Sequence, residues 1–322
     1  MSLQSSTRLG CCGWLRGELS CKTPLFGLTD PNGKTLDLER SFGMSNDGRF
    51  VRLLLKFCFW AWCVKALVKQ WVISTHPHWF IAYLTQWTLL LTCIYMACSL
   101  YLSTITNTDN KKTLQGLKNY QWQLVKITWG LFSIVSCAGG GVVLMYWLAI
   151  YDYTSGAPEY YSVMSHGVAF LLVLIDGFVL NKIPLRLKHY LFTVSYGLLF
   201  VGWSLIAAYA NIDNPDTSSE DNTEALYSIL DWINSPVSAT ISSVGVNFVV
   251  LPLYAIIFWG VSISCCRKYK EDQETEEAGA SASVSGAIVA GDKLTDDNGS
   301  DTHVGDNEDD IEEGGIIEAK PY

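Results

Sequence analysis

The stretch YSVMSHGVAFLLVLIDGFVL, from Tyr161 to Leu180, decides the fold class of this chain. As a helix it would be about 30 Å long, which is the thickness of the hydrocarbon core of a bilayer. Two ionisable residues interrupt its apolar pattern, His166 and Asp176. Because such groups are costly in lipid, we expect both to face the interior of a helix bundle and to have partners there.

Similar apolar runs recur along the chain, whose 322 residues are 49% apolar and only 16% charged. Each run is near or above the roughly 18 residues that indicate a membrane span, so the sequence predicts an all-α, polytopic membrane protein with six transmembrane helices. We expect the spans at residues 53–73, 79–103, 124–150, 163–181, 187–210 and 241–264. No signal-peptide pattern precedes the first run, so we expect the N-terminus to be retained.

The positions of Lys and Arg predict the orientation of the spans. They occur in the first 52 residues, in the connections after the second and fourth spans, and directly after the sixth. The other three connections contain none: 74–78, 151–162 and 211–240. Since basic residues are enriched on the cytosolic side, we expect both termini to be cytosolic.

Acidic residues are concentrated at the C-terminal end. Residues 271–322 contain 16 Asp and Glu against two lysines, whereas residues 1–270 have a net charge of +5. The acidic end has too few apolar side chains to form a core. The sequence therefore predicts three parts: a cytosolic N-terminal segment (1–50), a six-helix transmembrane domain (51–266) and a disordered acidic cytosolic tail (267–322).

Charged residues within the predicted spans need partners or access to water. Lys56 and Lys69 lie near the ends of the first span and are expected to extend toward water, whereas Lys65 lies deeper and needs a neighbour or a water-filled cleft. A tilted or partly interfacial first helix is the alternative to a normal span. Asp176 is expected to form a structural charge pair near the cytosol, and its candidate partners are Lys126, Lys182, Arg186 and His189. Three consecutive glycines in the third span, Gly139–Gly141, favour close helix packing.

None of the ten cysteines falls in a predicted outer connection, so a disulfide framework is not expected. Four are candidates for S-palmitoylation, with unmodified thiols as the alternative: Cys265 and Cys266 after the sixth span, and Cys11 and Cys12 in the N-terminal segment. The sequence contains no zinc-type cysteine spacing, no phosphate-binding glycine loop and no basic patch interleaved with aromatics. We therefore expect no cofactor, no metal site and no nucleic-acid partner.

Three polar side chains fall at a similar depth in the predicted topology. Thr85 in the second span, His166 in the fourth and Asn247 in the sixth lie about 5–10 Å below the outer surface. This coincidence suggests a shared site, with helix–helix packing or structural hydrogen bonding as the alternative. Asp231 precedes the sixth span on the side from which it would orient His166, unless it is only a solvated or helix-capping carboxylate.

Three motifs resemble the rolling stone family of invertebrate multi-pass membrane proteins: WFIAYLTQWTLLLTCIYMACSLYLS, SHGVAFLLVLIDGFVLNKIPLRLKHYLFTVSYGLLFVGWSLI and LYSILDW. The stretch LFGLTDPNG near the N-terminus is also similar to that family. The resemblance extends over residues 20–266 and leaves out the acidic tail. Because the family is associated with myoblast fusion, the resemblance implies a plasma-membrane role in contact or fusion between cells.

The chain is more distantly similar to the androgen-induced and androgen-dependent transmembrane proteins, which are intramembrane threonine hydrolases of fatty-acid esters of hydroxy fatty acids. YLT at 83–85 matches the stretch that contains their nucleophile, and SHG at 165–167 resembles that of their histidine, with Ser165 where those enzymes have Asn. The resemblance implies Thr85 as nucleophile, His166 as general base and a lipid ester as substrate. Asp231 and Asn247 are weaker candidates for the same site.

Two functions therefore compete. The first is a rolling-stone-like role in cell–cell interaction or fusion, at the plasma membrane rather than the endoplasmic reticulum, with the lipid bilayer as partner. The second is hydrolysis of a lipid ester in a cavity open to the outer leaflet. A transporter is a third interpretation, supported only by Asp176, Lys65 and Asn247 within the spans.

Overall fold

The computed structural model describes residues 25–26, 41–43, 48–73, 82–105, 119–151, 153–154, 156–158, 160–210 and 225–263. All regular structure in these ranges is helical and none is strand, which confirms the predicted all-α class. The predicted acidic tail lies outside the described residues, as do the four cysteines proposed for acylation. Disorder of the tail and the cytosolic location of the termini therefore stay predictions.

The helices have the following bounds: α3 (Arg49–Ile73), α4 (Leu84–Thr104), α5 (Asn119–Met145), α6 (Tyr160–Val163), α7 (Ala169–Leu174), α8 (Tyr190–Tyr209) and α9 (Pro236–Gly245). Four π-helical turns extend or interrupt them in the described ranges: η3 (Tyr146–Ile150), η4 (Met164–Val168), η5 (Ile175–Leu180) and η8 (Val246–Val250). Two short 3-10 turns are η6 (Leu187–His189) and η7 (Ser228–Leu230).

Five continuous helices in these ranges are long and apolar enough to cross a membrane: Leu84–Thr104, Tyr120–Ile150, Tyr160–Leu180, Leu187–Tyr209 and Pro236–Ile263. Each overlaps one of the predicted spans. The predicted first span corresponds to α3, a helix of 25 residues that has the length but carries several basic residues. The structure thus supports five spans, and the sixth stays a prediction.

Polar residues within the spans coincide with the π-helical turns. His166 lies in η4, Asp176 in η5 and Asn247 in η8, whereas η3 begins at Tyr146. A π-helical turn inserts one extra residue into the helix, and such turns are frequent at functional sites. Three of the π-helical turns therefore contain a polar side chain within an otherwise apolar helix bundle.

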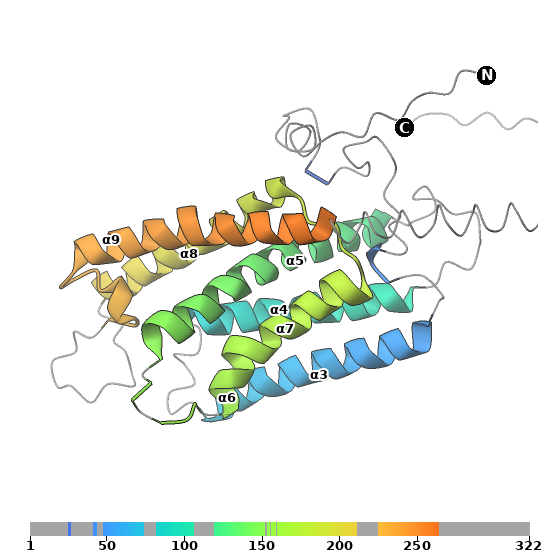
Figure 1. Ribbon diagram of the computed structural model, residues 1–322, viewed down its shortest axis with the longest axis horizontal. Helices are drawn as coiled ribbons and strands as arrows, with labels where there is room; N and C mark the ends of the chain where they lie inside the picture. Colours follow the sequence, from blue (N-terminus) through green and yellow to red (C-terminus); the bar gives the residue numbers. More distant parts are fainter. Residues whose placement is uncertain are drawn as a thin grey trace, which may run out of the picture. The chain divides into compact units, whose positions relative to one another are not determined.

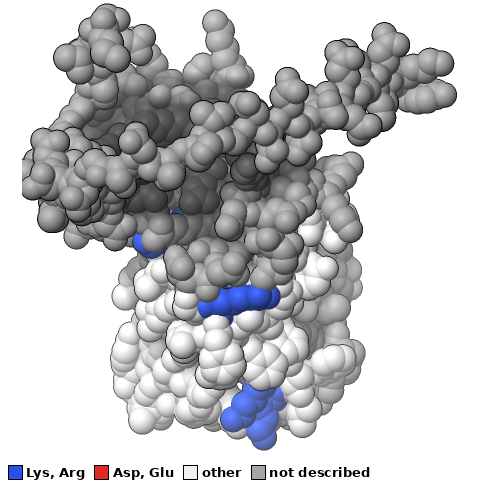
Figure 2. Space-filling model, turned by 90° about the vertical axis from the view of Figure 1, so that its right-hand side faces the viewer, with Lys and Arg blue, Asp and Glu red and all other residues white. Residues whose placement is uncertain are grey.

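The central helix is α5, which packs against α4, α7 and α8. In Figure 1, α3 lies beside α4 on one side of α5, and α9 lies beside α8 on the other. The outward faces are apolar: Leu171, Leu199 and Val249 are each more than half exposed. Figure 2 shows one face on which the described surface is largely uncharged, with Lys and Arg in separate patches. Single exposed apolar side chains are common in soluble proteins, but so many large ones with few charges between them are not, so this surface suits contact with lipid.

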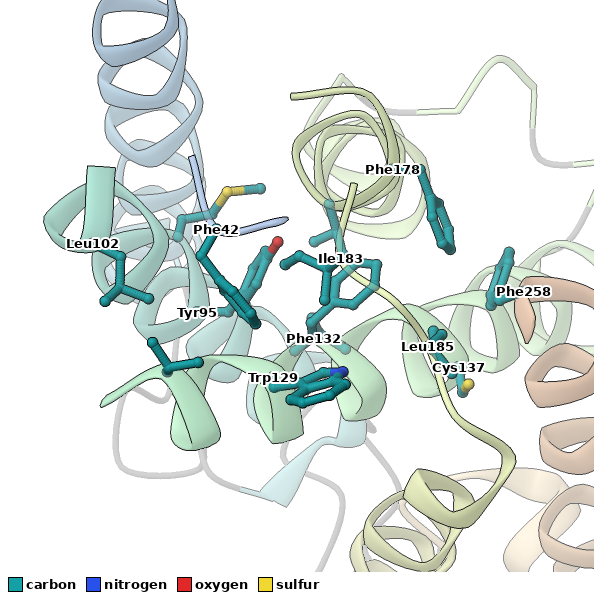
Figure 3. Close-up of a cluster of buried hydrophobic side chains, with 14 of the residues drawn as sticks. Phe42, Tyr95, Leu102, Trp129, Phe132, Cys137, Phe178, Ile183, Leu185 and Phe258 are labelled. Carbon is teal, nitrogen blue, oxygen red and sulfur yellow. The ribbon is translucent and has the colours of Figure 1, made fainter. Parts of the chain in front are cut away.

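The core is an aromatic cluster around Trp129 and Phe132 of α5, both fully buried (Figure 3). The Phe132 ring lies 5.6 Å from that of Tyr95 and 5.3 Å from that of Phe178, measured between centroids. Phe42, from the segment before α3, packs its edge against Trp129 at 6.1 Å. Four separate parts of the chain therefore share one core.

Glycines in α5 allow its neighbours to approach closely, as the sequence predicted. A Cβ atom on Gly140 would lie 2.7 Å from the ring of Tyr254, and one on Gly139 would lie 3.1 Å from the ring of Phe170. Gly141 has a similar contact with Leu251 at 3.1 Å. Larger residues at these positions would push the neighbouring helices apart.

Candidate functional site

Asp176 is buried and forms an ion pair with Lys56 of α3. The distance from Lys56 Nζ to Asp176 Oδ1 is 3.6 Å, and the two side chains are 1% and 0% exposed. The predicted pairing of Asp176 with a cation is confirmed, but the cation is Lys56 and none of the four candidates predicted from sequence. The expectation that Lys56 extends toward water is wrong, because Asp176 offers it a charged partner inside the bundle.

Three neutral side chains complete this buried network. Tyr95 OH and Ser99 Oγ, both on α4, donate hydrogen bonds of 2.7 and 2.8 Å to Asp176 Oδ2, and Asn181 Nδ2 donates one of 3.0 Å. Lys56 Nζ in turn donates to Ser99 Oγ at 2.8 Å and to Asn181 Oδ1. The network joins α3, α4 and η5 and leaves few polar atoms unpaired, so it is suited to holding helices together.

Gly43 closes one side of the network. Its φ of +71° lies in the left-handed region, and a Cβ atom there would lie 2.7 Å from Asn181 Oδ1 and 2.8 Å from Ser103 Oγ. Arg52 donates a hydrogen bond of 3.1 Å to the Gly43 carbonyl oxygen. Only glycine meets both the conformational and the spatial requirement at this position.

A cavity of about 90 Å³ lies among α4, α5, α8, α9 and the η7 segment. On the same measure one water molecule requires about 10–15 Å³, so the cavity has room for a slender group. We call it the outer cavity, because its lining includes residues next to the predicted outer connections. Residues that line it include Thr85, Val142, Tyr196, Tyr227, Val246 and Asn247.

Thr85 reaches the outer cavity from the first turn of α4, where it meets Tyr227. Tyr227 OH accepts a hydrogen bond of 3.2 Å from the backbone N–H of Leu84 and interacts with the Thr85 side chain. Burial raises the pKa of Tyr227 to about 12, although its hydrogen bonds with Thr85 and Leu84 act in the opposite direction. Tyr227 is therefore neutral at physiological pH and places a hydroxyl beside that of Thr85.

Asn247 and Ser243 also line the cavity, on the helix that begins with α9. Asn247 Nδ2 donates a hydrogen bond of 2.9 Å to the Ser243 carbonyl oxygen, and Tyr190 OH donates to the Asn247 carbonyl oxygen. Asn247 Oδ1 and Ser243 Oγ are both buried without a hydrogen-bond partner. Both side chains thus keep unused hydrogen-bonding capacity at the edge of an apolar space.

His166 stacks on a tyrosine that lines this cavity. Its imidazole stacks on the ring of Tyr146 with 3.6 Å between centroids and 2° between planes. Tyr146 lines the outer cavity, whereas His166 is not among the lining residues. His166 Nδ1 is buried without a hydrogen-bond partner. The structure thus brings Thr85 and Asn247 to one cavity, whereas His166 is in contact with Tyr146 and is not among the lining residues.

Asp231 forms a turn of its own before α9. Its Oδ1 accepts hydrogen bonds from the backbone N–H of Ile233 at 3.2 Å and of Asn234 at 2.8 Å. The hydrogen bond from the Asn234 backbone is the main reason why the pKa of Asp231 lies below its ordinary value. The carboxylate therefore binds its own turn and does not cap α9, whose N-cap residue is Ser235 and which has no side-chain capping hydrogen bond.

Tyr146, Tyr196 and Tyr227 were not singled out from the sequence, although all three line the outer cavity. Tyr196 OH is within 2.9 Å of Thr88 Oγ1, one turn after Thr85 on α4. Tyr227 falls within the motif LYSILDW, which was the available signal. In the part of the chain that the structure describes, no group of three or more His, Cys, Asp or Glu could hold a metal ion.

Comparison with protein families gives one match. The family model described as "Protein rolling stone" matches residues 38–270, which is well over half of the chain and includes every helix described above. No curated protein and no solved structure matches the chain.

Proposed function

Because the chain belongs to the rolling stone family, we propose that it acts in contact or fusion between cells, as an integral protein of the plasma membrane. The observation that carries this proposal is the family match over residues 38–270. Five helices long and apolar enough to cross a membrane support the multi-pass arrangement that this role requires.

The small share of the chain in the predicted outer connections suggests how such a role would be performed. The longest predicted outer connection is 211–240, so little of the chain projects from the outer surface. A protein of this form would act through lateral contacts with other membrane proteins or with lipids, because the predicted outer connections are too short to bridge two cells.

A content-mixing assay tests this proposal. Two populations of cells that lack the protein carry complementary halves of a split fluorescent reporter, and the chain is restored in one or both populations. We expect more fused cells when it is present, and no increase when both populations receive an empty vector. Full surface expression with no change in adhesion or content mixing would refute the role.

Hydrolysis of a lipid ester is the second candidate, and the position of Thr85 favours it. The Thr85 side chain lines an apolar cavity between membrane-spanning helices, beside the neutral hydroxyl of Tyr227. In this reaction Thr85 Oγ would attack the ester carbonyl and give its proton to a base, the alcohol would leave, and water would then cleave the acyl-threonine. His166 would serve as base only after its ring left the stack on Tyr146.

Labelling with a fluorophosphonate lipid probe tests this candidate. We expect wild type to be labelled, and Thr85→Ala and His166→Ala to lose labelling. Thr92→Ala is the matched control, because Thr92 lies on the same helix and bonds only the carbonyl oxygen of Thr88. An unlabelled but well-folded wild type would exclude the hydrolase and leave the first proposal untouched.

A further inference from the structure

We propose that the outer cavity binds the single acyl or alkyl chain of an uncharged lipid. The proposal rests on the proposed function only in taking the surrounding helices to lie in a bilayer. It requires neither hydrolysis nor fusion, because it concerns what occupies the cavity.

The shape of the cavity fits one extended chain. Its lining follows α5 and η3 from Ala138 to Ile150, a length of about 18 Å along a helix. Since the volume is only about 90 Å³, we infer that the space along this lining is a narrow tube. A row of methylene groups fits such a tube.

The wall excludes charged ligands. Among the residues that the structure describes, no Lys, Arg, His, Asp or Glu lines the cavity. An ionised carboxylate or phosphate buried there would have no cation to neutralise it, and this is costly in a medium of low dielectric constant. Side chains such as Val142, Met145, Val246 and Leu251 instead offer apolar contact along the tube.

The outer end of the cavity supplies neutral hydrogen-bonding groups for a head. Leu84 and Thr85 begin α4, Ile150 ends η3, and Tyr227 precedes η7, so this end lies at the predicted outer connections. The hydroxyl groups of Thr85 and Tyr227 are suited to pair with an alcohol or an ether oxygen. We therefore place the head of the lipid at this end and its chain toward Ala138.

Water is a poor alternative occupant of the deep part. The unpaired Asn247 Oδ1 and Ser243 Oγ offer a water molecule one partner each, but a water molecule needs two to four, and side chains such as Ala138, Val142 and Leu251 make the rest of this wall apolar. The bilayer around the helices, by contrast, supplies chains at high local concentration. An empty cavity would also forfeit the dispersion contacts that a chain restores.

Photo-crosslinking of the full-length protein in nanodiscs tests the proposal. The probe is a 1-O-alkyl glycerol with a diazirine in the chain, whose ether bond no esterase can cleave. We expect saturable labelling of peptides that contain Val142, Met145 or Val246, and competition by unlabelled alkyl glycerol. A fatty acid with the same diazirine chain should label at least fivefold less, because its carboxylate finds no cation.

Two matched variants locate the site. Val246→Phe fills the cavity and should lower labelling about tenfold, whereas Val249→Phe lies on the exposed face of the same helix and should leave it unchanged. Thr85→Val removes the candidate nucleophile and one of the two hydroxyl groups proposed for the head, so it should lower labelling less than Val246→Phe does, whereas it would abolish hydrolysis; this difference separates the two proposals. Equal labelling of Val246→Phe and wild type, or labelling that never saturates, would overturn the proposal.

Discussion

Lys56 Nζ and Asp176 Oδ1 lie 3.6 Å apart in a site where neither side chain is more than 1% exposed. This contact connects α3, the least apolar of the long helices, to the helix that decides the fold class. The same Asp176 carboxylate accepts hydrogen bonds from Tyr95 and Ser99 of α4. The ion pair therefore ties α3 to the bundle by charge as well as by apolar packing.

Removal of one member of this pair should destabilise the protein strongly. Asp176→Leu leaves the Lys56 ammonium buried without a counter-charge, and breaking a buried pair in this way costs about 3–5 kcal/mol. The double variant Lys56→Met with Asp176→Leu should lose less, because no unpaired charge remains. Thermal unfolding in detergent measures both. The single variant Lys56→Met completes the comparison. If the double variant lost as much stability as Lys56→Met and Asp176→Leu together, the ion pair would make no coupled contribution to stability.

The left-handed conformation and tight surroundings of Gly43 should make it intolerant of a side chain. Gly43→Ala combines the cost of a left-handed alanine, about 1–2 kcal/mol, with overlap against Asn181 Oδ1 and Ser103 Oγ. Gly48 is a matched control, since its φ is +61° but nothing lies within 4 Å of its Cβ position. Thermal unfolding should therefore show a larger loss for Gly43→Ala than for Gly48→Ala. Equal losses of stability in the two variants would mean that the left-handed backbone conformation alone, and not the contacts around Gly43, sets the cost of the alanine.

Two glycines on α8 should respond in opposite directions to alanine. A Cβ atom at Gly197 would overlap Asn247 Oδ1, whereas nothing lies within 4 Å of one at Gly202. Gly202→Ala should stabilise the helix by about 0.5–1 kcal/mol, because it restricts the unfolded chain. Gly197→Ala should destabilise by about 1–3 kcal/mol, because it displaces Asn247. If Gly197→Ala were more stable than wild type, Asn247 of η8 would move away from α8 without cost.

The positions of the helices could be predicted from sequence because long apolar runs bounded by charged or polar connections leave few alternatives. Which side chains of different helices contact one another could not be predicted in the same way. Lys56 was expected to extend toward water because it lies near the end of its own helix, and nothing in the local sequence shows that Asp176 lies opposite it. Tyr95 and Ser99, one turn apart on α4, were the available signal for a polar face.

The candidate site was predicted in part. Thr85 and Asn247 both line the outer cavity, but not at one depth: Thr85 is the second residue of α4, whereas Asn247 lies 11 residues into the helix that begins at Pro236. His166 was expected at the same depth as both, but depth along a helix does not determine the direction of a side chain around it. The π-helical turns change that direction locally, and neither η4 nor η3 has a clear signature in the sequence. The stack of His166 on Tyr146 could therefore be found only in the structure.

The turn formed by Asp231 should contribute stability at neutral pH and lose it in acid. Its folded-state pKa is lowered, chiefly by the hydrogen bond from the Asn234 backbone, so the ionised form is favoured in the folded state. The contribution is therefore complete above the unfolded pKa of about 3.9 and is lost as the pH falls through the folded pKa.

Asp231→Ala should melt at a lower temperature than wild type at pH 7, and this gap in melting temperature should close toward acid pH. Asp231→Asn keeps an acceptor oxygen without a charge, so its gap to Asp231→Ala should not depend on pH. A gap between wild type and Asp231→Ala that stayed constant from neutral to acid pH would show that the carboxylate charge makes no contribution to the turn.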